Sequence, residues 1–248
     1  MISLKSKDEI ELMRRANGIV RDLLLYMEEN VKVGITTKEL DRLAYEFITK
    51  AGAKPSFLGF EGFPGSICTS IDECVVHGIP SDKEYLEEGQ IISIDVGTIY
   101  KGWQGDAART FAVGKISPEK QRLIDVTRES FFKGMEVVKD GVRLGDLGHA
   151  IQAHAEGAGY GVVRELCGHG IGREMHEDPE VLNFGTPGRG LRLKSNMTIA
   201  VEPMITLGSR QIECSEDGWR IVTRDRKPAA HYENTILITD DGCEILSL

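Results

Sequence analysis

Four carboxylates lie within or beside apolar, strand-like segments, where acidic side chains are uncommon. Asp95 lies inside the run IISIDVG, and Asp106 follows it eleven positions later on the expected returning strand. Glu202 ends the run MTIAVE, and Glu233 directly precedes NTILI. Aspartate is depleted in strands, and desolvating an unpaired charge is costly. One such residue is usually a surface position, but four in separate strands favour a single convergent site.

A convergent site of this kind predicts bound metal. Two divalent cations would balance the four negative charges of these carboxylates. His169, in the segment CGHGIG, adds an imidazole flanked by glycines, which is typical of close backbone packing around a ligand. An oxygen-rich site with one imidazole suits manganese, iron or cobalt at least as well as zinc. The residues therefore predict a two-metal hydrolase that activates a water.

The relation between the two aspartates depends on the turn that joins their strands. If the turn is Tyr100 and Lys101, Asp95 and Asp106 face each other directly across the ladder. If the turn is Lys101 and Gly102, they become diagonal neighbours on one face. Like charges in either arrangement destabilise a hairpin unless something positive lies between them. Two surface aspartates at a solvated edge are the alternative.

The remaining histidines fall into two groups. His77 in VHGIP and His176 in MHEDP lie in segments that favour a functional interpretation. His149, His154 and His231 are interpreted as ordinary polar residues with satisfied hydrogen bonds.

Capping residues, periodicity and turn residues predict a mixed fold in one domain, residues 1–248. Helices are expected after the capping boxes Ser6/Glu9 and Thr36/Glu39 (ending near Gly52), from Ser117-Pro118-Glu119, and from about Gly145 towards Gly157. Strands are expected at Ile67–Ser70, Gln90–Ile99, Gly102–Val113, Met197–Val201, Gly218–Thr223 and His231–Thr239. Because helices and strands mix without strict alternation, an α+β class with a largely antiparallel sheet is favoured.

Composition excludes several classes of protein. A formal net charge of −9 argues against a DNA-binding role, and no apolar run reaches membrane-spanning length. The N-terminus lacks the apolar core of a secretion signal. The five cysteines are scattered without a C-x-x-C pair, which is typical of free thiols in a reducing cytoplasm. We therefore expect a cytoplasmic protein.

The ordered segments IDVGTIYKGWQGD, GHGIG, MHEDP, VEPM and HYENTILIT resemble the type I methionine aminopeptidases. Each segment alone is a weak signal, but the ordered set is specific and spans nearly the whole chain. The resemblance implies the pita-bread (creatinase/aminopeptidase) fold, a curved antiparallel sheet flanked by helices with pseudo-twofold symmetry. It also implies a bacterial-style enzyme, since a long N-terminal extension is lacking.

The resemblance also assigns roles to the metal-site residues. Asp95 would chelate one metal, His169 and Glu202 would ligate the other, and Asp106 and Glu233 would bridge the pair. The metals would be cobalt, manganese, iron or zinc. A hydroxide bridging them would attack the first peptide carbonyl and release the N-terminal methionine. Glu202 would transfer the water's proton to the leaving amine.

The same resemblance predicts the substrate contacts. His77 and His176 would hydrogen-bond the substrate and the tetrahedral intermediate. The residues expected around the methionine side chain are Phe57, Phe60, Phe63, Cys68, Met175, Met204 and Trp219. Many relatives carry cysteine at position 57, tyrosine at 60 and 63, and phenylalanine at 175. These differences keep the pocket apolar but remove hydroxyl groups, so they concern the substrate rim rather than the chemistry.

Methionine followed by a small residue is the expected substrate, at the start of a nascent polypeptide. The resemblance implies a monomer in transient contact with the ribosome, although the sequence shows no basic patch for that contact. Relatives often bind a monovalent cation near residues 70–74, but Asp72 stands where asparagine is common, so the same cation is not assumed.

Four other functions are alternatives to this interpretation. X-Pro aminopeptidases and dipeptidases share the five ligands but carry an extra N-terminal domain, for which 248 residues leave no room. Type II methionine aminopeptidases insert a helical subdomain that does not fit between His176 and Glu202. A non-catalytic pita-bread protein that binds protein or RNA would have lost ligands. A two-metal phosphoesterase would require a phosphate-cradling glycine loop, which this sequence does not show.

Overall fold

The computed structural model describes residues 2–248. Its helices lie where the sequence predicts them. They are α1 (Lys7–Asn30), α2 (Thr37–Lys50), α3 (Pro118–Met135) and α4 (Leu144–Gly157), and a 3₁₀ turn, η1, covers Phe60–Gly62. None of the helices formed by these residues has the length and apolarity that a membrane crossing requires.

The first two capping signals act differently. Ser6 accepts the amide of Glu9, whose carboxylate accepts the Ser6 amide at 2.9 Å, so this capping box is complete. Thr36 accepts the amide of Glu39 at 3.1 Å, but the Glu39 carboxylate binds Arg42 at 2.8 Å. The second box is therefore only half formed, because an exposed ion pair takes its acid.

The strands form four hydrogen-bonded sheets, and every observed pairing among residues 2–248 is antiparallel. One sheet contains β1 (Lys54–Pro55), β2 (Ile67–Ile71), β4 (Ile91–Tyr100) and β5 (Trp103–Ala112). A second contains β7 (Gly168–Gly170), β8 (Glu177–Val181), β9 (Thr198–Val201), β14 (Asn234–Ile238) and β15 (Cys243–Ile245). The smaller sheets contain β6 (Gly161–Val162), β10 (Met204–Thr206) and β13 (Ala229–His231), and β3 (Cys74–Val76), β11 (Ile212–Cys214) and β12 (Ile221–Thr223).

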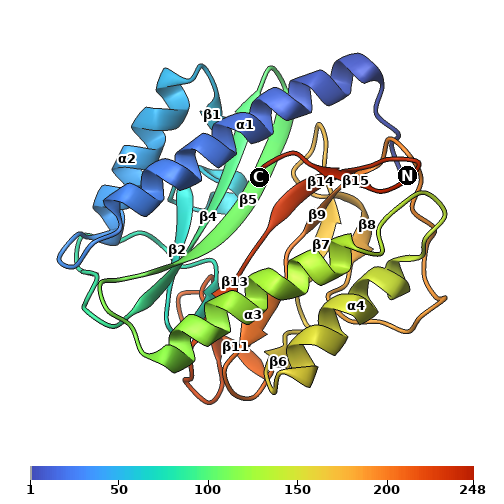
Figure 1. The fold of residues 1–248 in the computed structure, drawn as a ribbon. Coiled ribbons are helices and arrows are strands. Elements are labelled where there is room, and N and C mark those ends of the chain that lie inside the picture. The colour runs from blue at the N-terminus through green and yellow to red at the C-terminus, as the bar shows by residue number, and fades with distance from the viewer. Residues whose placement is uncertain (1) are drawn as a thin grey trace.

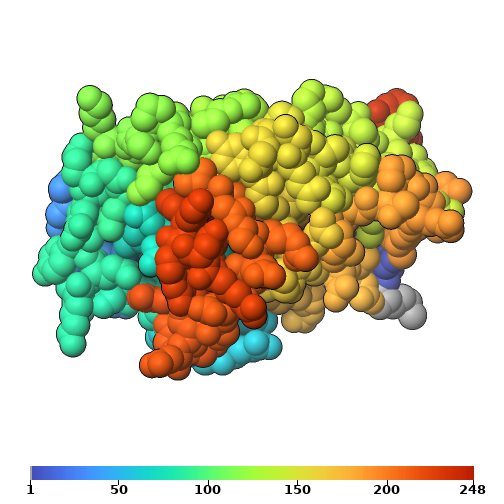
Figure 2. All heavy atoms as spheres, turned by 90° about the horizontal axis from the view of Figure 1, so that it is seen from below, coloured from blue at the N-terminus to red at the C-terminus, as the bar shows by residue number. Residues whose placement is uncertain are grey.

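Two helix pairs cover the sheets. In Figure 1 the long helices α1 and α3 cross in front of the strands, α1 over β4 and β5 and α3 over the second half of the chain. Each half has its own buried cluster of apolar side chains, for example around Leu23 and Ile94 in the first and around Phe131 and Ile199 in the second. Seen from below, the segment with β11 and β12 projects from the surface (Figure 2, red-orange). The α+β prediction is confirmed.

The hairpin of β4 and β5 settles the alternative left open by the sequence. Tyr100 pairs with Trp103, so the turn is Lys101 and Gly102, which have φ values of +50° and +80°. Positive φ at both positions is the type I′ geometry that matches the twist of a hairpin. Asp106 therefore pairs with Gly97, a diagonal neighbour of Asp95 on the same face.

Candidate metal centre

The two aspartates stand on the central hairpin of the first half. Asp95 is on β4, and Asp106 is on β5, where it is only 3% exposed. Asn17 of α1 accepts the Asp106 amide at 3.2 Å, and a Cβ at Gly105 would lie 2.7 Å from the carbonyl carbon of Ala16. The helix therefore packs directly on the strand and fixes the backbone at Asp106.

His169 enters from β7 on the other side of the site. Its Nε2 lies 3.5 Å from Asp106 Oδ2 and 3.7 Å from Glu202 Oε1. Its Nδ1 lies 2.9 Å from the Gly170 carbonyl, which can only accept, so Nδ1 carries the proton. This tautomer leaves Nε2 free to ligate a metal. A Cβ at Gly168 would lie 2.3 Å from the Ala200 carbonyl oxygen, so the flanking glycine is required by the neighbouring strand.

Glu202 and Glu233 stand at breaks between strands. Glu202 lies between β9 and β10, and Glu233 separates β13 from β14 where one continuous strand was predicted. The Glu233 amide donates to Ala108 on β5 at 3.0 Å, and Arg109 donates to the Glu233 carbonyl at 2.5 Å. These bonds hold the second half of the chain against the first at the site.

The charges of the site are strongly unfavourable without a cation. Burial, together with repulsion from Asp106 and Glu202, raises the pKa of Asp95 and of Glu233 well above their usual values. Burial opposes protonation of His169, but its contact with Asp106 and the charge of Glu202 outweigh this and raise its pKa. Buried oxygens of Asp95 and Asp106 have no hydrogen-bond partner within residues 2–248.

This donor set fits divalent cations. Ligand atoms of Asp106, His169 and Glu233 all lie within 4.8 Å of one another. Carboxylate oxygens with one imidazole are ligands that manganese, iron, cobalt and zinc accept. Orphaned buried oxygens and mutually repelling carboxylates are the features that a bound cation would satisfy.

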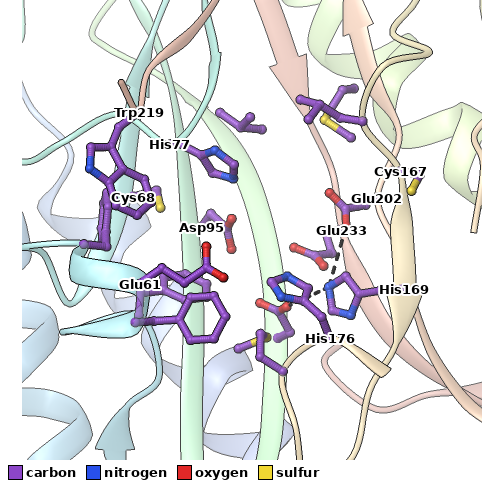
Figure 3. A pocket seen from close by; sticks show the side chains of 18 residues that line it. Glu61, Cys68, His77, Asp95, Cys167, His169, His176, Glu202, Trp219 and Glu233 are labelled. Atoms are coloured by element: carbon purple, nitrogen blue, oxygen red, sulfur yellow. Dashed lines mark ion pairs between the residues drawn. The ribbon is translucent and has the colours of Figure 1, made fainter. Parts of the chain in front are cut away.

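The site forms one wall of a cavity of about 250 Å³. Every residue that the sequence predicted for the site lines this cavity. Figure 3 shows Asp95 and His77 approaching from one side and His169, Glu202 and Glu233 from the other. The predicted residues are therefore brought together from both halves of the chain.

The part of the cavity away from the carboxylates is mainly apolar. Cys68, Met175 and Met204 are buried, and burial raises the pKa of the Cys68 thiol well above its usual value. Phe63 and Trp219 meet edge to face with ring centroids 5.1 Å apart. This part of the cavity suits an uncharged side chain.

The two other predicted histidines lie at the open side of the cavity. His77 and His176 are both exposed, and His77 has a positive φ of 61°. The His176 ring lies edge-on to His169 with centroids 4.4 Å apart and to Phe60 with centroids 5.5 Å apart. Phe57 completes this side of the lining.

Four lining residues were missed by the sequence interpretation: Glu61, Val76, Leu166 and Cys167. Cys167 could have been found, because side chains two positions apart in an extended chain share a face and His169 lies two positions on. Nothing in the local sequence pattern marks Glu61. It reaches the cavity from the 3₁₀ turn η1, in which Glu61 itself has a φ of +50°. Its carboxylate points towards the centre in Figure 3.

The interpretation of the remaining histidines holds for His154, whose Nε2 lies 3.0 Å from Glu129 Oε2. It is wrong for His231. That side chain is buried, and neither ring nitrogen has a hydrogen-bond partner within residues 2–248.

The sequence and the fold both place the chain in a known family. Residues 11–240 match metallopeptidase family M24. The chain is 56% identical to the methionine aminopeptidase of Clostridium acetobutylicum over 248 residues, covering 100% of this chain and 99% of that protein. It is 44% identical to the Escherichia coli methionine aminopeptidase, covering 100% and 94%. The chain belongs to the M24 metallopeptidases.

Solved structures agree. The crystal structure of methionine aminopeptidase from Rickettsia prowazekii matches with a TM-score of 0.98 at 44% identity, covering 100% of both chains. A prolidase from Pyrococcus furiosus matches with a TM-score of 0.81 at 24% identity, covering 99% of this chain and 65% of that one. The prolidase likeness shows the fold alone. The predicted pita-bread fold and family are confirmed.

Proposed function

We propose that this chain is a metal-dependent aminopeptidase that removes methionine from the N-terminus of polypeptides. The observation that carries the proposal is that five candidate ligands, Asp95, Asp106, His169, Glu202 and Glu233, line one small, mainly apolar cavity. The names of the full-length relatives support the same activity. We further propose that residues 1–248 act as one catalytic domain, because both halves supply ligands.

Metal ligation would follow the roles that the resemblance to the methionine aminopeptidases implies. Asp95 would bind one cation, His169 and Glu202 the other, and Asp106 and Glu233 both. When bound, divalent cations supply a Lewis acid for the scissile carbonyl and a water of lowered pKa. Glu202 is suited to accept a proton from that water and pass it to the leaving amine, because its side chain is more exposed, at 14%, than those of Asp106 and His169, at 5% and 11%.

The two exposed histidines would act on the substrate. A neutral imidazole can donate one hydrogen bond, and His77 and His176 line the cavity, with the His176 ring 4.4 Å from that of His169, so both are placed to reach a carbonyl bound at the candidate metal site. A donor placed at a developing oxyanion typically contributes on the order of a hundredfold in rate. Removing either histidine should therefore reduce the rate while the metals remain bound.

The apolar part of the cavity would hold the methionine side chain. Cys68, Met204 and Trp219 offer contacts without charge, which suits a thioether. Phe57, Phe60 and Phe63 make the rim apolar as well. We expect methionine at the first position and a small residue at the second, despite the lack of hydroxyl groups at this rim.

The substrates would be nascent polypeptides, met by a monomer in the cytoplasm during transient contact with the ribosome. The cysteine pattern supports the location, because five scattered cysteines without a C-x-x-C pair are typical of free thiols in a reducing compartment. Sedimentation of the purified chain would test the monomer, and its co-sedimentation with ribosomes would test the contact.

The activity is tested by hydrolysis of the peptide Met-Ala-Ser. Metal-stripped protein should be inactive, and manganese or cobalt should restore the release of free methionine. Glu202→Ala should stay inactive with the same metals. If the loaded protein cleaves an X-Pro peptide but not Met-Ala-Ser, it is an X-Pro peptidase. Metal binding without cleavage of either would indicate a non-catalytic protein.

Specificity requires a second experiment. Peptides that vary at the first two positions should be cleaved fastest with methionine first and alanine, glycine or serine second. The proposed pocket is wrong if leucine at the first position is accepted as well as methionine. The proposed rim is wrong if a bulky second residue has no effect on kcat/KM.

A further inference from the structure

His231 is a buried imidazole that the proposed chemistry does not use. It ends β13, is 1% exposed, and is absent from the cavity lining. Its backbone is held by Thr110, whose hydroxyl accepts the His231 amide and donates to the His231 carbonyl, both at 2.9 Å. The backbone is therefore anchored while both ring nitrogens lack a partner within residues 2–248.

A buried imidazole without a partner is unfavourable, because it has lost its hydrogen bonds to water. The Glu202 carboxylate is an acceptor close to this ring. His231 Nε2 is 3.6 Å from Glu202 Oε2, slightly beyond hydrogen-bond distance. A small movement of the Glu202 side chain would close this gap, since Glu202 stands in a break between two strands.

The Glu202 carboxylate lies between two imidazoles, with one oxygen towards each. Its Oε1 is 3.7 Å from His169 Nε2, the pair that Figure 3 marks, and its Oε2 is 3.6 Å from His231 Nε2. His169 Nε2 also faces Asp106, so Oε1 is the oxygen directed towards the other metal-binding side chains. The two oxygens of Glu202 are therefore in different surroundings.

We propose that His231 is a positioning residue for Glu202: its Nε2–H donates to Glu202 Oε2 and leaves Oε1 to face His169. This inference rests on the proposed function of Glu202. A hydrogen bond from behind the cavity would prevent rotation of the carboxylate and fix which oxygen reaches a cation. Partners of this kind, which orient a ligand, typically contribute 10–100-fold to metal affinity or activity.

The tautomer of His231 gives a direct test. The measurement is the NMR spectrum of zinc-loaded protein with ¹⁵N-labelled histidine. The ring signals that are present in the unmodified protein and absent in His231→Gln belong to His231. The proposal expects a protonated Nε2 and a bare Nδ1. A protonated Nδ1 with a bare Nε2 would overturn it, because that ring cannot donate to Glu202. This test holds even if the protein does not cleave Met-Ala-Ser, so it is independent of the proposed activity.

Two variants separate hydrogen bonding from packing. His231→Gln keeps an N–H donor, whereas His231→Leu fills similar space without one. We expect His231→Leu to lower kcat for Met-Ala-Ser by about 10–100-fold with little change in KM, and His231→Gln to restore most of it. The absorption spectrum of the cobalt-loaded protein should change in the leucine variant and not in the glutamine variant.

The thermal unfolding midpoint of each metal-free variant serves as the control that the variant is still folded. If both variants lose activity equally while remaining folded, the donor has no role and the proposal fails. It also fails if the leucine variant keeps the cobalt spectrum and kcat of the unmodified protein.

Discussion

Lys5 and Glu177 are separated by 172 positions and form an ion pair of 2.6 Å, in which the lysine side chain is only 2% exposed. Glu177 also accepts the amide of Arg173 at 2.8 Å, and the Lys5 amide donates to the Asn196 carbonyl at 2.8 Å. The N-terminal segment therefore holds the turn that precedes His176 at the open side of the cavity.

Lys5→Met should destabilise the protein by about 3 kcal/mol, because removing one member of a buried pair leaves the other charge unpaired. Urea unfolding measures the effect. The matched control is the double variant Lys5→Met/Glu177→Met, which should recover at least half of the loss, since an apolar pair replaces the ionic one. A loss below about 1 kcal/mol in the single variant would show that water already compensates Glu177.

Gly97→Ala should narrow the cavity. An added Cβ would lie 2.7 Å from Phe57 Cε1 and 2.8 Å from Met175 Cε, so the Phe57 ring and the Met175 thioether, which both line the cavity, must move. We expect KM for Met-Ala-Ser to rise more than kcat falls. The control is Gly18→Ala on α1, where a Cβ meets nothing within 4 Å and should add about 0.5–1 kcal/mol of stability. An unchanged KM would contradict this account of Gly97.

Arg109→Met should weaken metal binding although Arg109 touches no proposed ligand side chain. Its guanidinium donates to the Glu233 carbonyl at 2.5 Å and to Asn234 Oδ1 at 2.7 Å, and it lies 4.2 Å from the Tyr232 ring centroid. We expect a 10–100-fold loss of manganese affinity by titration calorimetry. Arg109→Lys should recover little, because an ammonium cannot reproduce the planar fork. Equal affinity in all three proteins would show that Glu233 is held by the strands alone.

Metal should stabilise the folded protein, because it binds the converging carboxylates only when they are assembled. At a free manganese concentration of 100 times Kd, the free energy of unfolding should rise by about 2.7 kcal/mol. Asp106→Asn should remove most of this gain, whereas Asp82→Asn, at an exposed position, should keep it. Thermal unfolding with and without manganese makes the comparison. An equal gain in both variants would place the binding elsewhere.

Cys74 should make stability depend on pH in the alkaline range. Burial raises the pKa of its thiol to about 11 from an ordinary value of about 9, with a partly opposing hydrogen bond to Ser70. The folded state then keeps a proton that the unfolded state has lost, so this contribution is present below pH 9 and is lost as the pH rises towards 11.

The difference in free energy of unfolding between the unmodified protein and Cys74→Ala should therefore shrink by about 1–3 kcal/mol from pH 8 to 11. Urea unfolding at both pH values measures it. A difference that is constant across this range would show that the thiol is not protected by burial.

The helices were predictable because their signals are local. Ser6, Thr36 and Ser117 each accept an amide three residues on, as capping residues do, and this depends on neighbouring residues alone. The long strands β4 and β5 were also predictable, because they extend over ten residues each and are joined by the short turn at Lys101 and Gly102. Of the short strands, β2, β9 and β12 were predicted, whereas β7 and β8 were missed because Gly-His-Gly and Glu-Asp-Pro-Glu-Val contain no run of apolar residues.

Around Glu233 the local sequence pattern predicts the wrong strand boundaries. The run from His231 to Thr239 reads as one strand, but the structure breaks it between β13 and β14. Each part pairs with a different sheet, β13 with β10 and β14 with β9 and β15. The break was not predictable because it depends on distant partners, and it is the break that places Glu233 at the site.

The sequence by itself determined the residue types of the site, the order of its segments and the family, since these are properties of the chain that folding does not alter. Only the tertiary structure decided the diagonal placement of Asp95 and Asp106, the burial of Lys5 and the position of the His231 ring beside Glu202. These depend on which surfaces meet, and a side chain 172 positions away is invisible to any local pattern.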